Sequence, residues 1–192
     1  GVVFADHQVI GYPIYQGVQP DEPTYLAQHN KFKAITAACM AVRAVDFSRV
    51  KGFDCHYING QEDIDLCLRL CDTSEKYCSV VHDCNIIHLE SKTPNRGKYI
   101  RQNRQFFAQR WRSRIVSDDK SYYSQDNLSI EAWQRDSDEF IRLGIAAHRP
   151  ILRPRKIQEP QYGWSREHEP LLISDLLNHE KSHANMLSRL KV

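Results

Sequence analysis

Glu62 and Asp63 are adjacent carboxylates that stand immediately before an apolar run in the segment GQEDIDLCLRLC. A carboxylate in such a place could act as a general base, taking a proton from a hydroxyl group as that group attacks an electrophilic carbon. The positive end of a helix dipole would orient it and keep it ionised, and would also lower its basicity. Asp63 is therefore the first candidate for a catalytic base. The alternative is that both acids only favour the start of a helix.

The residues that follow predict the helix that positions these acids. Apolar side chains recur at i, i+3, i+4 and i+7, the pattern of a helix with one face toward a core. They are Ile64, Cys67, Leu68 and Cys71. On this pattern Asp65 and Arg69 lie on the opposite face, four residues apart, in the order that favours an ion pair. We expect this pair to be structural rather than catalytic.

Three further segments stand in order around this helix. TAACMAVR (36–43) and GFD (52–54) precede it, and HLES (88–91) follows it. Together with GQEDIDLCLR (60–69), they resemble the second half of the catalytic domain of family 2 glycosyltransferases with the GT-A fold, especially bacterial enzymes that build surface polysaccharides. The resemblance covers roughly residues 1–125. One Glu-Asp pair would be weak evidence, whereas four ordered blocks are far more specific.

This resemblance implies inverting transfer of a sugar from a nucleotide-diphosphate sugar to a saccharide or lipid-linked acceptor. It maps the catalytic base onto Asp63, with Glu62 beside it. It implies donor-binding or acceptor-binding roles for Thr36, Ala37, Ala38, Cys39, Phe53, Asp54 and Arg96. Arg96 would reach the diphosphate, although an arginine in solvent is an equal alternative.

The resemblance also implies a divalent metal, Mn²⁺ or Mg²⁺, that neutralises the leaving diphosphate. In the family the main metal-binding DxD motif lies upstream of these blocks, so we expect it outside this chain. Asp63 and Asp65 have the letters of that motif but belong to the acceptor-side helix. His88 resembles a family histidine that adds a metal or phosphate contact, and a structural histidine is the alternative.

The chain departs from the family pattern at three positions. Ala37 stands where relatives usually have glycine, so the local backbone need not be the same. Lys51 replaces the first glycine of the GGFDE turn, and Cys55 replaces its glutamate. These differences bear on the acceptor rather than on the fold.

Two other patterns carry the letters of a zinc site. Residues 179–183 read HEKSH, which matches the HExxH signature of zinc proteases. However, that segment is polar, and only nine residues remain for a third ligand. The second is a cluster without a CxxC knuckle: Cys67, Cys71, Cys78, His82, Cys84 and His88. We expect neither to bind zinc.

Composition points to an ordinary globular protein, since 41% of the 192 residues are hydrophobic and 26% are charged. A net charge of +2 creates no cationic field, so no nucleic-acid partner is expected. No apolar run approaches the roughly 18 residues that cross a bilayer, and residues 1–5 lack a signal-peptide pattern. We expect a cytoplasmic protein, at most peripherally associated with the inner face of the membrane. Its six cysteines should be reduced and mostly buried.

Hydrophobic periodicity and turn residues predict the elements along the chain. They are a strand at Val2–Phe4, a buried strand at 35–42, a helix at 45–50 ended by Gly52, a strand at 78–88, a basic helix at 98–115, a helix at 131–143, a proline-rich linker at 148–163 and an amphipathic segment at 171–190.

These elements, read with the resemblance, predict an α/β fold. Residues 1–125 would form the C-terminal part of a GT-A, Rossmann-like domain with a mixed sheet, and residues 126–192 a helical extension. The nucleotide-binding half of such a domain is missing from these residues, so we expect the isolated chain to be inactive. The alternative function is a non-catalytic, degenerate glycosyltransferase-like module that packs against a partner through 171–190.

Overall fold

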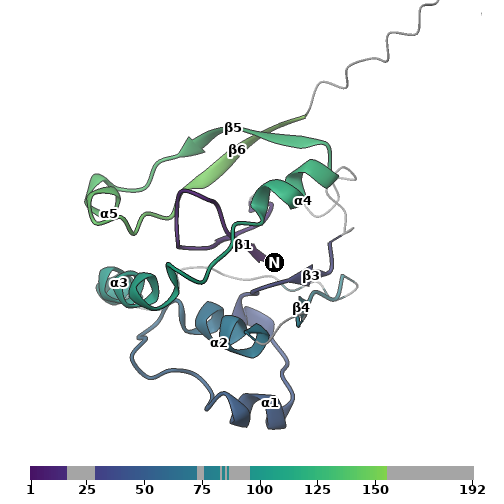
Figure 1. Ribbon diagram of the computed structural model, residues 1–192, viewed down its shortest axis with the longest axis vertical. Helices are drawn as coiled ribbons and strands as arrows, with labels where there is room; N and C mark the ends of the chain where they lie inside the picture. Colours follow the sequence, from purple (N-terminus) through teal and green to yellow (C-terminus); the bar gives the residue numbers. More distant parts are fainter. Residues whose placement is uncertain (17–28, 73–75, 83, 85, 87–95, 155–192) are drawn as a thin grey trace, which may run out of the picture. The chain divides into compact units, whose positions relative to one another are not determined.

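In the part of the chain that the structure describes, the strands pair into three small antiparallel sheets (Figure 1). In the computed structural model they are β1 (Val2–Val3) with β2 (Tyr12–Pro13), β3 (Lys31–Phe32) with β4 (Cys78–Ser79), and β5 (Leu128–Gln134) with β6 (Arg149–Pro154). The structure describes residues 1–16, 29–72, 76–82, 84, 86 and 96–154. His88, the HEKSH segment and the amphipathic segment at 171–190 lie outside these residues.

Five α-helices and two short 3-10 helices accompany the sheets in the described part of the chain. The α-helices are α1 (Ala44–Arg49), α2 (Glu62–Cys71), α3 (Ile100–Trp111), α4 (Asp119–Gln125) and α5 (Asp138–Arg142). The 3-10 helices are η2 (Ala37–Cys39) and η3 (Arg96–Tyr99). The protein is therefore mixed α/β, as predicted. The predicted mixed sheet is not found among the described residues, whose sheets are all antiparallel pairs of strands.

Strand β1 is buried on both faces. Val2 and Phe4 contact one hydrophobic cluster, which includes Cys67 of α2, Phe107 of α3 and Trp111 of α3. The alternate residues of the same segment, Val3 and Ala5, contact a second cluster with Phe32, Tyr123 and Leu128. Successive side chains of an extended chain point to opposite sides, which explains the division. The continuous apolar run at the start of the sequence reflects this two-sided burial.

The predicted helices at 45–50 and 98–115 are confirmed as α1 and α3, the latter preceded by η3. Helix α1 ends where expected, because Lys51 and Gly52 adopt positive φ angles of 62° and 67°. Gly52 suits such a conformation, since it has no Cβ atom.

The predicted buried strand at 35–42 is wrong. Val2 forms a bridge with Ala34, after which the chain turns into η2, leaving Thr36, Ala38 and Cys39 exposed. Small side chains bury little apolar area, so burial does not hold this segment in a sheet.

The predicted helix at 131–143 and linker at 148–163 are also wrong in part. Residues 128–134 form β5, which pairs with β6 through partners such as Trp133 with Pro150. Only the short α5 remains helical. Two prolines are tolerated in β6 because, among the described strands, it bonds only to β5. The remainder of the predicted linker, from residue 155, lies outside the described residues.

The division of the chain does not coincide with the boundary expected after residue 125. Gly1–Arg155 is one compact unit and Lys156–Val192 another. Leu128 is buried in the cluster that contains Val3 and Phe32, so β5 belongs to the same unit as the N-terminal strands.

The six cysteines are free thiols. Cys67 and Cys71 are buried and Cys78 is half-buried, whereas Cys39, Cys55 and Cys84 are exposed. The prediction of mostly buried thiols is therefore wrong, since only two of the six are buried. Among the described residues, no helix has the length and apolar character needed to span a bilayer.

Candidate active site

The loop before α2 sets the position of Glu62 and Asp63. Gln61, the residue that caps the helix, has a positive φ angle of 75°, and Gly60 before it has φ 152°. The Glu62 carboxylate accepts the Gly60 N–H, closing the loop onto the first turn. Both acids therefore stand in the first turn of α2, as the sequence predicts.

Asp63 links α2 to the small-residue segment 36–39. Its Oδ2 atom accepts the Ala37 N–H at 3.0 Å, and its Oδ1 atom accepts the Ile64 N–H at 2.8 Å. The side chain is half-buried. A carboxylate has about four lone-pair sites, so two hydrogen bonds leave it able to accept a further proton. Two of the sequence blocks thus meet at one carboxylate.

Sulfur contacts along α2 hold the same segment in place. One turn after Asp63, the Cys67 Sγ atom donates to the Ile35 carbonyl at 3.6 Å and lies 4.0 Å from the Met40 sulfur. Cys67 is fully buried, and Ile64 is also part of the core. Segment 35–40 therefore packs along the side of the helix whose first turn carries Asp63.

Asp65 has a different place from the one predicted. It is fully buried rather than on an outer face. It accepts hydrogen bonds from Trp111 Nε1 at 2.9 Å, Arg69 Nε at 2.7 Å and Tyr57 Oη at 3.3 Å. The predicted pairing with Arg69 is confirmed, but the helix packs on α3 with a second face, and Asp65 is the hydrogen-bonding centre of that contact.

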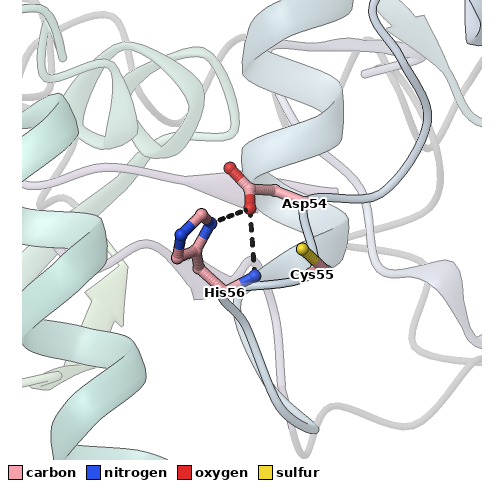
Figure 2. Close-up of side chains that lie close together, drawn as sticks. All are labelled: Asp54, Cys55 and His56. Atoms are coloured by element: carbon pink, nitrogen blue, oxygen red, sulfur yellow. Dashed lines mark hydrogen bonds and ion pairs between the residues drawn. The ribbon is translucent and has the colours of Figure 1, made fainter.

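Asp54 faces α3 rather than Asp63. Its Oδ2 atom accepts from Arg110 at 2.7 Å, and its Oδ1 atom accepts the His56 backbone N–H at 3.0 Å. The His56 Nδ1 atom lies 2.7 Å from the Asp54 Oδ1 atom. Figure 2 shows the carboxyl group and the ring turned toward each other. These bonds, above all the one from the His56 backbone, lower the pKa of Asp54 to about 2. The carboxylate anchors its loop to α3.

Asp54, Cys55 and His56 also form the one group in the described residues whose ligand atoms lie close enough to hold a metal ion (Figure 2). A thiol and an imidazole are zinc-type ligands, whereas Mn²⁺ and Mg²⁺ prefer oxygen. In addition, the Arg110 guanidinium already neutralises the carboxylate. This cluster does not fit the diphosphate-binding metal that the sequence implies.

The other predicted binding residues are dispersed. Thr36, Ala38 and Cys39 present exposed surface around the contact between Ala37 and Asp63. Phe53 packs edge-on against Phe47, with ring centroids 5.6 Å apart. The backbone of Arg96 begins η3, while its side chain and His88 lie outside the described structure.

Gln61, the residue before α2, lines a polar cleft of about 560 Å³. Its lining includes Arg104 of α3, and Gln134, Arg135, Asp136 and Arg149 from the β5–β6 region, but not Asp63. Arg104 is held by an ion pair with Asp136 and lies over the Phe140 ring at 4.4 Å. Sequence patterns did not indicate this cleft, because its residues come from segments far apart in the chain.

Asn103 positions the loop that leads to α2. Its side-chain amide donates to the Ile58 carbonyl at 2.8 Å and accepts the Ile58 N–H at 3.2 Å, and Asn103 is almost fully buried. A signal for it exists in the sequence. Asn103 precedes Phe107 and Trp111 at intervals of four, so an amide stands on the apolar stripe of a helix.

Comparisons with models of known families, with curated proteins and with solved structures found no match to this chain.

Proposed function

We propose that this chain carries the acceptor side of an inverting glycosyltransferase that uses a nucleotide-diphosphate sugar, with Asp63 as the catalytic base. The observation that carries the proposal is the hydrogen bond between Asp63 and the Ala37 N–H. It joins two of the four blocks on which the family resemblance rests. The acceptor implied by that resemblance is a glycan or lipid-linked saccharide of bacterial surface polysaccharide synthesis.

The chemistry assigned to Asp63 is removal of one proton. An acceptor hydroxyl hydrogen-bonds to a carboxylate oxygen, loses its proton there, and attacks the anomeric carbon of the donor sugar. The nucleoside diphosphate leaves from the opposite face, which inverts the anomeric centre. Ala37 N–H and Ile64 N–H fix the carboxylate, so its free lone pairs keep a constant direction.

The exposed small residues around this carboxylate suit the approach of a sugar. Ala38 and Cys39 have short side chains and border Asp63 through η2. Gln61, which lines the polar cleft, stands two residues before Asp63 in the sequence. The amide, guanidinium and carboxyl groups that line this cleft are donors and acceptors for sugar hydroxyls. We assign this cleft to a distal part of the acceptor, because Asp63 does not line it.

The divalent metal belongs to the leaving diphosphate in this proposal. Its principal ligands would come from outside this chain, with His88 as a further contact. The metal would neutralise charge on the departing phosphates. In this proposal the described residues contribute Asp63 as the base and the Ala37 and Ile64 N–H groups that hold its carboxylate.

The test is turnover of nucleotide-diphosphate sugars by the protein together with any sequence adjoining this chain in its gene. Release of nucleoside diphosphate is measured over a panel of donors with Mn²⁺ and a saccharide acceptor. Asp63→Asn should lower kcat by about 100-fold or more, since the amide cannot take the proton. The matched control is Asp138→Asn, which removes an exposed acid from the first turn of α5.

Near-normal turnover by Asp63→Asn would remove Asp63 from the role of base. If the unsubstituted protein releases no nucleoside diphosphate with any donor, the non-catalytic interaction module becomes the better interpretation.

A further inference from the structure

Four sulfur atoms gather where α2 ends beside β4. Cys71 is the last residue of α2 and Cys78 the first of β4, and their Sγ atoms lie 3.9 Å apart. Cys67 lies one helical turn before Cys71, and its Sγ atom is 4.0 Å from the Met40 sulfur. The sequence did not predict this meeting of Cys71 with Cys78.

Of the three thiols in this group, two line a solvent-facing cleft. Cys71 and Cys78 are among the residues around a cleft of about 360 Å³, together with Met40, Leu70 and Lys76. Cys67 is not among its lining residues and is fully buried. A small oxidant in the cleft would therefore reach Cys71 and Cys78 before Cys67.

Hydrogen bonds among the thiols, together with nearby charges, make the pKa values of Cys71 and Cys78 unequal. The hydrogen bond with Cys78 lowers the pKa of Cys71 to about 7, and the ammonium groups of Lys33 and Lys76 act in the same direction. The pKa of Cys78 is raised, chiefly because its thiol pairs with Cys67 and Cys71. The pKa of Cys67 is lowered too, chiefly by its hydrogen bond with Cys78. Of the two thiols that line the cleft, Cys71 therefore forms the thiolate more readily near neutral pH, and Cys78 more readily keeps its proton.

We propose that Cys71 and Cys78 form a redox-active dithiol that a hydroperoxide oxidises to an intramolecular disulfide. In the first step the Cys71 thiolate attacks the terminal oxygen of the hydroperoxide and the O–O bond breaks. The departing alkoxide or hydroxide takes a proton from the solvent and leaves as an alcohol or water. Cys71 becomes a sulfenic acid, oxidised by two electrons.

The second step joins the two sulfurs. Cys78 attacks the Cys71 sulfur, the S–O bond breaks, and the departing hydroxide leaves as water with the proton of Cys78. A disulfide bond is about 2.05 Å long, so the two Sγ atoms must approach by about 2 Å. Cys71 ends α2 and Cys78 begins β4.

The disulfide would fasten the end of α2 to β4 across the cleft. Ile35 and Met40 line the same cleft. Ala37, whose N–H binds Asp63, lies between them in the sequence. Formation of the disulfide would therefore displace segment 35–43. The proposal itself concerns thiol chemistry alone and does not depend on the function of Asp63.

The experiment treats the full chain with hydrogen peroxide in a background in which the exposed thiols are removed by Cys39→Ser, Cys55→Ser and Cys84→Ser. Two of the three remaining thiols should be lost per chain, and dithiothreitol should restore both. Trypsin cuts after Arg69 and Lys76, so the peptides with Cys67, Cys71 and Cys78 are separated. Mass spectrometry should find peptide 70–76 joined to peptide 77–92.

The rate of oxidation should level off above about pH 8, since the pKa of Cys71 is about 7. Between pH 7 and 8 the rate should rise only about twofold, whereas an ordinary thiol with a pKa of about 8.5 would gain about eightfold over the same range. Cys71→Ser and Cys78→Ser should each abolish the cross-link, whereas Cys67→Ser, the matched control, should retain it. A cross-link through Cys67, or a Cys71 that is still alkylated after peroxide treatment, would overturn the proposal.

Discussion

Asp118 and Asp119 show how the surroundings of a single carboxyl decide its role. Asp118 accepts the Phe4 N–H at 2.8 Å, and Asp119, which is fully buried, accepts the Tyr12 hydroxyl at 2.8 Å. Both tie the start of α4 to the first two strands. Burial raises the pKa of the Asp118 carboxyl from 3.8 to about 6, so its ionisation opposes folding near neutral pH.

The sign of the resulting pH dependence follows from proton binding. Between about pH 4 and pH 6 the folded protein binds the Asp118 proton and the unfolded chain does not. The stabilising contribution of the protonated form is therefore present below about pH 4 and is lost as the pH rises through 6. Asp118→Asn keeps an oxygen for the Phe4 N–H but removes the titration.

We therefore expect Asp118→Asn to raise the free energy of unfolding at pH 7.5, relative to the natural chain, by about 1–2 kcal/mol more than it does at pH 4. Urea denaturation at both pH values measures the difference. Asp138→Asn, at an exposed position of α5, should give no such difference between the two pH values. Equal effects of Asp118→Asn at the two pH values would contradict the assignment.

At the scale of elements, the contact between α2 and η2 depends on one backbone N–H. Ala37 is the first residue of η2, and Thr36 before it is extended, with φ −77° and ψ 143°. Proline is compatible with the first position of a helical turn when the preceding residue is extended. Ala37→Pro should therefore delete the donor to Asp63 without breaking the turn.

The expected cost of Ala37→Pro is about 1 kcal/mol in the free energy of unfolding, the usual contribution of one hydrogen bond. Ala37→Gly keeps the N–H and is the control. In an Asp63→Ala background the cost of the proline should disappear, because the acceptor is already gone. An undiminished cost in that background would mean that the proline acts through some other contact.

Sequence patterns predicted the elements whose apolar residues face one core, and failed where pairing between distant segments decided the structure. Helix α2 was predicted together with the place of Glu62 and Asp63 in its first turn, because a single apolar stripe defines it. The predicted outward orientation of Asp65 was wrong, since its partner Trp111 is remote in the sequence. Residues 128–134 became a strand because 149–154 pairs with them, which periodicity within 131–143 did not reveal.

The candidate site was predictable to a similar extent. Asp63 and segment 36–39 were identified by their order in the chain, and they do meet at Ala37. Asp54 was expected beside them but is bound by Arg110 of α3, a contact that no local spacing indicates. The cleft at Gln61 was missed for the same reason.

At the scale of the whole molecule, the division after Arg155 predicts which truncations keep the fold. A chain ending at residue 155 should unfold cooperatively, within about 1 kcal/mol of the full chain. A chain ending at residue 125 loses Leu128 and the packing of Trp133 and Leu152 on the second cluster. It should lose cooperative unfolding. Circular dichroism during urea denaturation distinguishes the two.

The contradictory outcome would be a chain of residues 1–125 that unfolds at the same urea concentration as the longer chain. That result would mean that β5 and β6 form an appended extension and do not stabilise the rest of the unit Gly1–Arg155.

The divided strand β1 has a thermodynamic consequence. Val2 and Phe4 serve one core while Val3 and Ala5 serve the other, so neither core can loosen without disturbing the backbone that the other requires. The stabilities of the two clusters are therefore coupled. A substitution that displaces the backbone at any of residues 2–5 should destabilise both clusters.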